Sequence, residues 1–174
     1  TRLFALVYGV GIVVTALLSN DATAVVLTPA VLAAASAAKV KDALPYAFIC
    51  AFIANAASFL LPISNPANLV VFGGGHMPPL VDWIARFLAP SVAAIVVTYV
   101  MLYLTQRRAL LADELAKDVQ VGRLEAGAKL AGVGILVTAV VLVGASAFDL
   151  DLGGPTCAAG VLTAIAALIR RREG

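Results

Sequence analysis

The stretch Leu18-Ser19-Asn20-Asp21-Ala22-Thr23 interrupts the apolar start of the chain, and it decides how the rest is interpreted. Apolar runs flank it at Leu3–Leu18 and Ala22–Ala38. At about 1.5 Å per residue, each run makes a helix of about 24–26 Å, somewhat shorter than a hydrocarbon core of about 30 Å. The pair is therefore either a re-entrant hairpin with its tip inside a membrane or two complete spans joined outside it.

The composition of the whole chain supports a membrane protein. Of the 174 residues, 62% are hydrophobic and 13% are charged, and the mean hydropathy is +1.02. Soluble domains are about 45–50% apolar and about 25% charged, so these values exclude a soluble globule, and the high hydrophobicity excludes disorder. A net charge of +2 with scattered basic clusters excludes a nucleic-acid-binding protein. The predicted class is an all-α integral membrane protein.

The basic residues predict the orientation of the chain in the membrane. Further apolar runs cover residues 43–72, 88–105, 130–148 and 156–169. Short cytoplasmic loops carry an excess of Lys and Arg. With the chain start, the connections after residues 38 and 105 and the final arginines on the inside, eleven of the twelve basic residues are cytoplasmic, and only Arg86 is outside.

A second polar interruption lies in the run over residues 43–72. One helix of that length would measure about 45 Å, which is too long for a straight span, and Pro62-Ile63-Ser64-Asn65-Pro66 must break it. Residues 63–72 align without gaps to residues 18–27 and share Ser-Asn-x-Ala-x-x-Val-Val. We interpret the two interruptions as a pair with one function. The alternative is that residues 44–61 span alone and Ser64–Asn68 begins an outer loop.

The residue types at the interruptions suit a polar binding site. Broken helices leave backbone groups unpaired in a membrane, and secondary transporters bind substrate between such elements. Asp21 is the only acid inside an apolar stretch, so it is both a candidate substrate contact and the candidate proton-coupling group. If the tip reaches water instead, Asp21 is only a helix cap. The other candidate substrate contacts are the hydroxyl and amide side chains of Ser19, Asn20, Thr23, Ser64, Asn65 and Asn68.

Residues 18–29, 52–58 and 62–69 resemble the arsenical pump membrane permease family. That family exports arsenite or antimonite, and it belongs to a superfamily that also holds sodium/proton antiporters and dicarboxylate and citrate carriers. The resemblance implies two inverted repeats, each with a re-entrant hairpin and a broken helix, and export driven by proton entry. By this likeness Ser19-Asn20-Asp21 is a hairpin tip within the membrane, and Ser64–Asn68 is the unwound loop of the broken helix.

The resemblance also implies a domain organisation. Residues 1–105 form the first transporter repeat, with a hairpin over 3–38, a broken helix over 43–72 and a helix over 88–105. Residues 106–129 form a cytoplasmic linker, and residues 130–174 hold the first helices of an incomplete second repeat. Asp82, Trp83 and Arg86 are expected to anchor the chain at the outer interface before the helix at Leu88.

The sequence thus predicts a secondary active transporter of the inner or plasma membrane that exports arsenite or antimonite in exchange for protons. Expected partners are the lipid bilayer and the remaining half of the transporter, and an ATPase subunit stays open. Cofactors, metals, nucleic acid and enzyme chemistry are not expected. Alternatives are a sodium/proton antiporter, a dicarboxylate or other anion carrier of the superfamily, and a non-transporting membrane subunit whose Ser-Asn motifs cap helices. A carboxylate carrier is less favoured because the broken elements contain no Lys or Arg.

Overall fold

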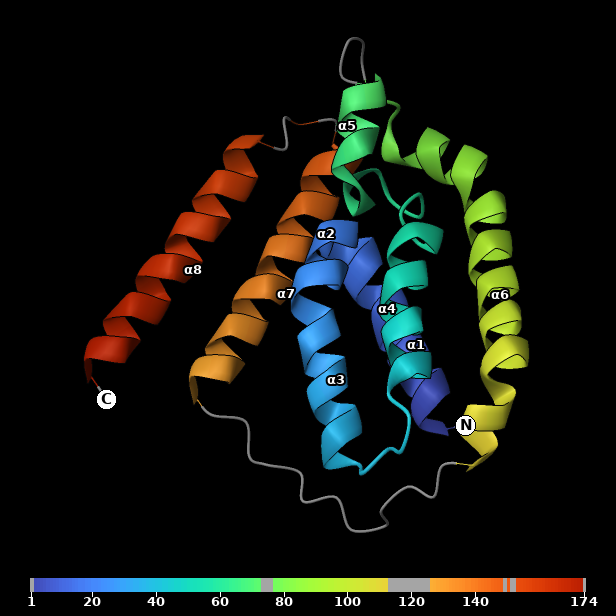
Figure 1. Ribbon diagram of the computed structural model, residues 1–174. Helices are drawn as coiled ribbons and strands as arrows, with labels where there is room; N and C mark the ends of the chain where they lie inside the picture. Colours follow the sequence, from blue (N-terminus) through green and yellow to red (C-terminus); the bar gives the residue numbers. More distant parts are fainter. Residues whose placement is uncertain (1, 73–76, 113–125, 149, 151–152, 174) are drawn as a thin grey trace. The chain divides into compact units, whose positions relative to one another are not determined.

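The computed structural model describes residues 2–72, 77–112, 126–148, 150 and 153–173, and every regular element in these ranges is helical (Figure 1). The helices divide into two units, the first formed by most of the chain up to α6 and the second mainly by α7 and α8. The elements are α1 (Arg2–Leu18), α2 (Asn20–Ala22), the π-helical turn η1 (Thr23–Leu27), α3 (Thr28–Ala37), α4 (Leu44–Ala56), the 3-10 turn η2 (Pro62–Ser64), α5 (Pro66–Phe72), α6 (Leu80–Ala112), α7 (Ala126–Ala147) and α8 (Gly153–Glu173).

The first two apolar runs form a helical hairpin. α1 ends at Leu18, and α2, η1 and α3 follow as one continuous helix, Asn20–Ala37, with only Ser19 between the two arms. Ser19 turns the chain with a φ of 129°, a backbone region that L-residues rarely adopt. The π-helical turn lies just before Pro29, which has no N–H to donate to the carbonyl of Val25.

The third apolar run is broken, as its length requires. α4 begins after Asp42, whose Oδ1 accepts a hydrogen bond of 2.9 Å from the Leu44 N–H. It ends at Ala56 after 13 residues, about 20 Å, which is too short to span a membrane alone. The break begins six residues before Pro62, because the Ser58 hydroxyl donates to the Asn55 carbonyl at 2.7 Å and competes with the next helical turn.

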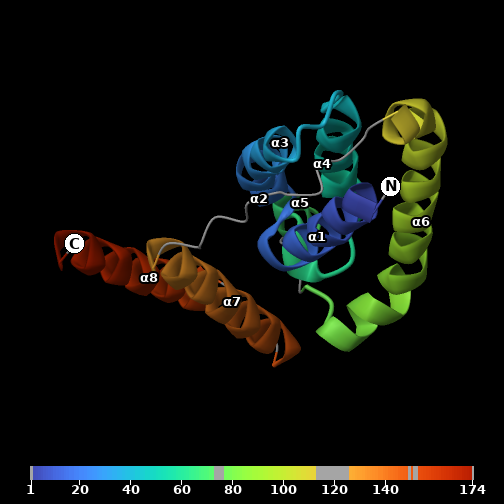
Figure 2. The same ribbon diagram turned by 90° about the horizontal axis from the view of Figure 1, so that it is seen from below.

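α6 is longer than the predicted helix over residues 88–105. It starts at Leu80 and continues to Ala112, with Pro90 inside it. Figures 1 and 2 show its first turns lying at a steep angle to the rest, and Pro90 accounts for such a bend because it removes one backbone hydrogen bond. The helix therefore includes the first residues of the predicted linker, whereas residues 113–125 of that linker lie outside the described ranges.

The structure buries the tryptophan of the predicted anchor within the protein, and the position of the anchor at the membrane interface stays a prediction. Trp83 has no exposed surface, and its ring contacts Phe72 and Phe87. Its indole N–H donates to the Phe59 carbonyl at 3.0 Å. An interfacial position could not be distinguished from this buried one by sequence, since both suit an amphipathic ring with a single donor.

α1 and α4 hold the first unit together. The buried apolar side chains of the hairpin and α4 form one cluster with the middle and end of α6. Tyr8 packs against Tyr99 and donates a 2.6 Å hydrogen bond to the Ile95 carbonyl, which joins α1 to α6. α1 approaches α4 so closely that a Cβ at Gly11 would lie 2.7 Å from Ile53 Cγ2. Glycine at this position therefore sets the spacing of the two helices.

α7 and α8 pack against each other as a second helical pair. A Cβ at Gly134 would lie 2.5 Å from Thr163 Cγ2, so this pair also depends on a glycine contact. Their bounds agree with the apolar runs predicted over residues 130–148 and 156–169, extended by several residues at most ends. The assignment of this pair to a second inverted repeat stays a prediction.

Two helices in the described residues, Asn20–Ala37 and Leu80–Ala112, are long and apolar enough to cross a membrane, and Arg2–Leu18 and Leu44–Ala56 are apolar but shorter. Large apolar side chains project outward from the hairpin, for example Val25 and Val26, which are 73% and 61% exposed. Such outward apolar surface suits contact with lipid or with further membrane helices.

Candidate functional site

The hairpin tip is capped by its own serine. The Ser19 side chain accepts a hydrogen bond of 3.3 Å from the Ala22 N–H, so Ser19 is the N-cap of the returning helix. Asn20 and Asp21 occupy the first turn, where backbone N–H groups have no partner within the helix. Asp21 is exposed in the described structure, and Asn20 is half-buried.

Thr23 is fixed by two hydrogen bonds and has no exposed surface. Its hydroxyl lies 2.8 Å from the Thr15 hydroxyl and donates to the Ser19 carbonyl at 3.2 Å. Thr15 is equally buried and was not among the predicted site residues. The sequence feature that could have identified Thr15 is its position on α1, one helical turn before Ser19. The Thr15–Thr23 hydrogen bond therefore joins the two arms of the hairpin next to the tip.

Asn68 donates hydrogen bonds to two backbone carbonyls that the break in the helix leaves unpaired. In a continuous helix, Pro62 and Pro66 would have to donate to the carbonyls of Ser58 and Pro62, and neither proline has an N–H. The Asn68 Nδ2 group donates to both of these carbonyls at 3.2 Å. Asn68 is 1% exposed, so its amide is committed to this structural role and is turned away from solvent.

Two further groups of this interruption are also satisfied. The Trp83 indole supplies a donor to the Phe59 carbonyl, as described above. The Asn65 Oδ1 accepts a 2.9 Å hydrogen bond from the Ala67 N–H and caps α5. The Asn65 side chain is therefore engaged by the backbone of its own segment.

Ser64 joins the two interruptions. Its hydroxyl donates to the Ala16 carbonyl at 2.8 Å and accepts from the Leu61 N–H at 3.1 Å. The Ala16 carbonyl lies in the last turn of α1, where the helix offers it no partner. Ser64 is fully buried, so the contact is shielded from solvent. The structure thus brings the predicted pair of motifs together, through a serine that bridges backbone to backbone.

One buried acceptor has no partner at the junction, by which we mean the contact between the hairpin tip (residues 19–23) and the broken helix (residues 62–68). The Asn20 Oδ1 is inaccessible and makes no hydrogen bond within the described residues. An unpaired buried carbonyl oxygen is costly, about 1–3 kcal/mol, unless a ligand or another part of the protein donates to it. Of the seven predicted site residues, Asn20 and Asp21 are those whose side chains make no hydrogen bond within the described residues.

Metal binding by the protein itself finds no support in the part of the chain that the structure describes. No group of three or more His, Cys, Asp or Glu side chains gathers there. Cys50 is buried and Cys157 is exposed, and neither forms a disulfide. The chemistry available at the junction is that of amide, carboxylate and backbone groups.

Comparison with known proteins agrees with a transporter. The chain is 37% identical over 111 residues to the arsenical pump membrane protein of Escherichia coli K12 and to that of Shigella flexneri, covering 61% of this chain and 25% of each relative. It is 44% identical over 59 residues to the uncharacterized transporter YfbS of Escherichia coli K12, covering 34% of this chain and 9% of that protein. The chain thus spans about a quarter of the arsenical pump relatives. No solved structure gives a significant match.

The match to a whole family is more extensive than the match to any of these relatives. The CitMHS family, described as citrate transporter, matches residues 1–173, which is almost the whole chain. This confirms the ion-transporter superfamily that the Ser-Asn motifs predicted. The chain is a membrane transporter segment, and it belongs to the CitMHS citrate transporter family.

Proposed function

We propose that the protein exports arsenite or antimonite across the inner membrane in exchange for protons. The substrate lies between the hairpin tip and the broken helix, and Asp21 carries the exchanged proton. The likeness to two arsenical pump membrane proteins, at 37% identity over 111 residues, supports the substrate. The remaining half of the transporter completes the site, and association with an ATPase subunit is a further part of the proposal.

The observation that carries this proposal is the division of polar groups at the junction. Ser64, Asn65 and Asn68 satisfy backbone groups around the break, while the Asn20 Oδ1 is buried and unpaired next to the exposed Asp21 carboxylate. Ser64, Asn65 and Asn68 therefore hold one side of the proposed site in place. Asn20 and Asp21 provide oxygens that can accept hydrogen bonds from a substrate. Ser19 and Thr23 hold the tip in place, and they contribute to the site by positioning it.

The chemistry of the substrate suits these acceptors. Arsenous acid is neutral near pH 7 and presents hydroxyl groups, so it can donate hydrogen bonds to the exposed Asp21 carboxylate, and to the Asn20 Oδ1 in a state of the transport cycle that exposes this oxygen. Its oxygens can accept from the free N–H groups in the first turn of the returning helix, where the helix dipole is positive. Such contacts release a substrate more readily than thiolates do, which suits transport.

The test uses everted membrane vesicles that contain the full-length protein, with arsenite outside, an imposed proton gradient and no sodium. We expect uptake that stops when the gradient is dissipated. Replacing Asp21→Asn removes the titratable group, so it abolishes gradient-driven uptake while insertion stays normal. The matched control is Asp82→Asn, which changes an exposed acid in the first turn of α6. Gradient-driven uptake that survives in Asp21→Asn would overturn the role of Asp21.

A second candidate, a carrier of citrate or another carboxylate, is favoured by the description of the family. Citrate needs positive charge at its site, and neither residues 18–27 nor residues 57–72 contain Lys or Arg. A bound cation or a basic side chain from elsewhere in the protein would have to supply it. The same vesicle assay distinguishes the two candidates. Uptake of labelled citrate without uptake of arsenite would replace the arsenite exporter with the carboxylate carrier.

The remaining alternatives have distinct signatures in the same assay. Uptake that follows a sodium gradient and ignores a proton gradient indicates sodium coupling. A non-transporting subunit shows no uptake of either substrate, and single cysteines at positions 20 and 65 then react freely with membrane-impermeant thiol reagents. In a transporter these cysteines react slowly, and substrate changes the rate.

A further inference from the structure

An apolar groove runs between α4 and the second half of α6, on a part of the first unit that the transport site does not use. It has a volume of about 480 Å³, and its lining includes Phe48 and Phe52 from α4 and Val97 and Met101 from α6. The lining extends along α6 to Thr105 and Gln106. From Val97 to Gln106 the groove is about 14 Å long, so it accommodates an extended hydrocarbon chain lying along the helices.

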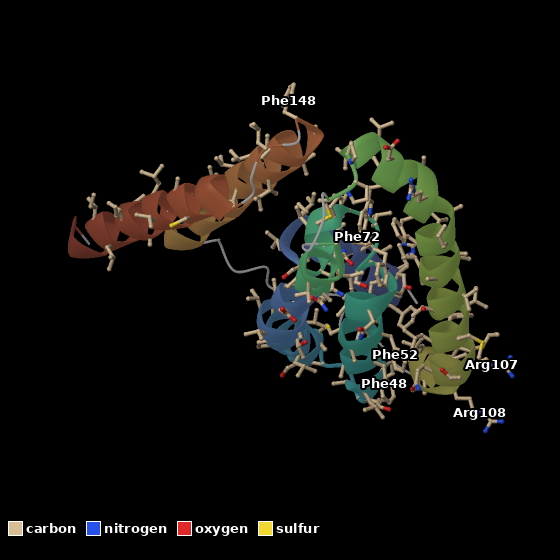
Figure 3. The ribbon with its side chains drawn as sticks, turned by 90° about the horizontal axis from the view of Figure 1, so that it is seen from above. Phe48, Phe52, Phe72, Arg107, Arg108 and Phe148 are labelled. Atoms are coloured by element: carbon tan, nitrogen blue, oxygen red, sulfur yellow. The ribbon has the colours of Figure 1, made fainter. Side chains whose placement is uncertain are left out.

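The surface of the groove is open and apolar. Phe52 and Met101 are 52% and 55% exposed, and Val97 is 60% exposed. Figure 3 shows Phe48 and Phe52 on the side of α4 that faces α6. The polar side chains give the groove little specificity, since Thr105 donates to carbonyls of its own helix at 2.8 and 3.1 Å. The groove therefore selects for apolar shape alone.

Positive charge gathers at one end of the groove. Arg107 and Arg108 follow Gln106 directly, both are exposed, and both point away from the helices in Figure 3. The start of α1 and the connection between α3 and α4 lie at the same end of the first unit (Figure 1) and carry Arg2, Lys39 and Lys41. Among the described residues at this end the one acid is Asp42, whose Oδ1 accepts a hydrogen bond from the Leu44 N–H. The charge predicts a negative partner just beyond the apolar groove.

We propose that this groove binds one anionic phospholipid of the inner leaflet. An acyl chain lies against Phe48, Phe52 and Met101, and Arg107 and Arg108 hold the phosphate. Arginine suits this role because its planar group donates two parallel hydrogen bonds to phosphate oxygens. The placement of the phosphate at the arginine end of the groove also agrees with the predicted orientation, in which this end of the first unit is cytoplasmic and faces anionic headgroups.

The experiment measures lipid binding to the purified full-length protein by native mass spectrometry. Phosphatidylglycerol or phosphatidylcholine with identical acyl chains is titrated into the detergent solution. Each arginine near an anionic lipid contributes a factor of about five in affinity. We therefore expect phosphatidylglycerol to bind about 25-fold more tightly than phosphatidylcholine. The double variant Arg107→Gln/Arg108→Gln should abolish this preference, whereas Arg86→Gln, on the same helix, should leave it intact.

A second pair of variants tests the groove separately from the charge. Met101→Trp places a large ring in the groove and should reduce binding of both lipids at least tenfold. Val100→Trp makes the same change at a neighbouring exposed position that does not line the groove, and it should leave binding unchanged. A phosphatidylglycerol preference that survives the double arginine variant would overturn the proposal. Unchanged binding in Met101→Trp would overturn it too, since another helix of the same protein would then fill the groove.

Discussion

The hairpin tip and the broken helix carry the same Ser-Asn motif but differ in how the asparagine side chain is used. In the broken helix, Ser64 bridges to α1, Asn65 caps α5 and Asn68 satisfies two carbonyls that prolines leave unpaired. At the tip, Ser19 caps the helix while the Asn20 Oδ1 stays unpaired. The difference follows from the prolines: Pro62 and Pro66 create backbone vacancies that nearby side chains must fill, and residues 19–23 contain no proline.

The comparison therefore separates stability from transport. Substitutions in the broken helix should mainly destabilise the protein, and substitutions at Asn20 or Asp21 should mainly affect transport. The following predictions concern the free energy of unfolding of the full-length protein in detergent, with transport measured in vesicles.

Asn68→Ala should have the largest effect on stability. It leaves the buried carbonyls of Ser58 and Pro62 without a donor, at an expected total cost of about 3 kcal/mol. The matched control is Asn55→Ala, which removes an exposed amide that bonds only to its own helix and should cost less than about 0.5 kcal/mol. Equal costs for the two variants would contradict the role assigned to Asn68.

Ser64→Ala should cost about 2 kcal/mol, because the Ala16 carbonyl and the Leu61 N–H both lose a buried partner. It should also loosen the tip, so thiol labelling of a cysteine placed at position 20 should become faster. Ser36→Ala, at an exposed position of α3, is the control. An unchanged labelling rate would show that Ser64 does not hold the two interruptions together.

Ser19 should respond differently to alanine and to glycine. Ser19→Ala removes the cap and keeps a side chain at a φ of 129°, at an expected cost of about 1 kcal/mol. Ser19→Gly also removes the cap but relieves the backbone, so its net change should lie within about 0.5 kcal/mol. Thermal unfolding of both variants measures the difference. A glycine variant as unstable as the alanine variant would contradict the strained turn.

Asn20→Ala should have the smallest effect on stability and a large effect on transport. Removing the unpaired buried Oδ1 relieves a cost, and the lost packing of the side chain offsets this gain, so the free energy of unfolding should change by less than about 0.5 kcal/mol. Arsenite uptake should require a substrate concentration about tenfold higher, since one hydrogen bond to the substrate is lost. A strongly destabilised variant would place Asn20 in the same structural class as Asn68.

The sequence was sufficient to predict the two interruptions, and their shared function stays a prediction. Apolar runs and the prolines at positions 62 and 66 carry that information locally. The roles of the polar side chains could not be predicted, because they depend on contacts between segments far apart in the chain. Ser64 and Ala16 are 48 positions apart, and Trp83 and Phe59 are 24 apart. No local pattern distinguishes a serine that bridges helices from one that binds a substrate.

Helix ends were predicted less well where side chains override apolar patterning. α4 ends at Ala56, although the residues up to Leu61 are mostly apolar, because Ser58 bonds back to the Asn55 carbonyl. α6 begins at Leu80, although charged residues follow, because Trp83 and Phe87 pack against Phe72 and continue the helix into the unit. Both errors arise from tertiary contacts that a hydropathy profile does not contain.

The close contact at Gly11 limits how the protein can move. The middle of α1 touches the last turn of α4, where there is no room for a methyl group beside Ile53, and the end of α1 is joined to η2 by the Ser64–Ala16 hydrogen bond. Because α1 contacts the broken helix on both sides of its break, it can neither pivot nor slide past that helix without breaking one of the two contacts. Any transport cycle that preserves both contacts must carry the hairpin arm and the broken helix as one rigid body.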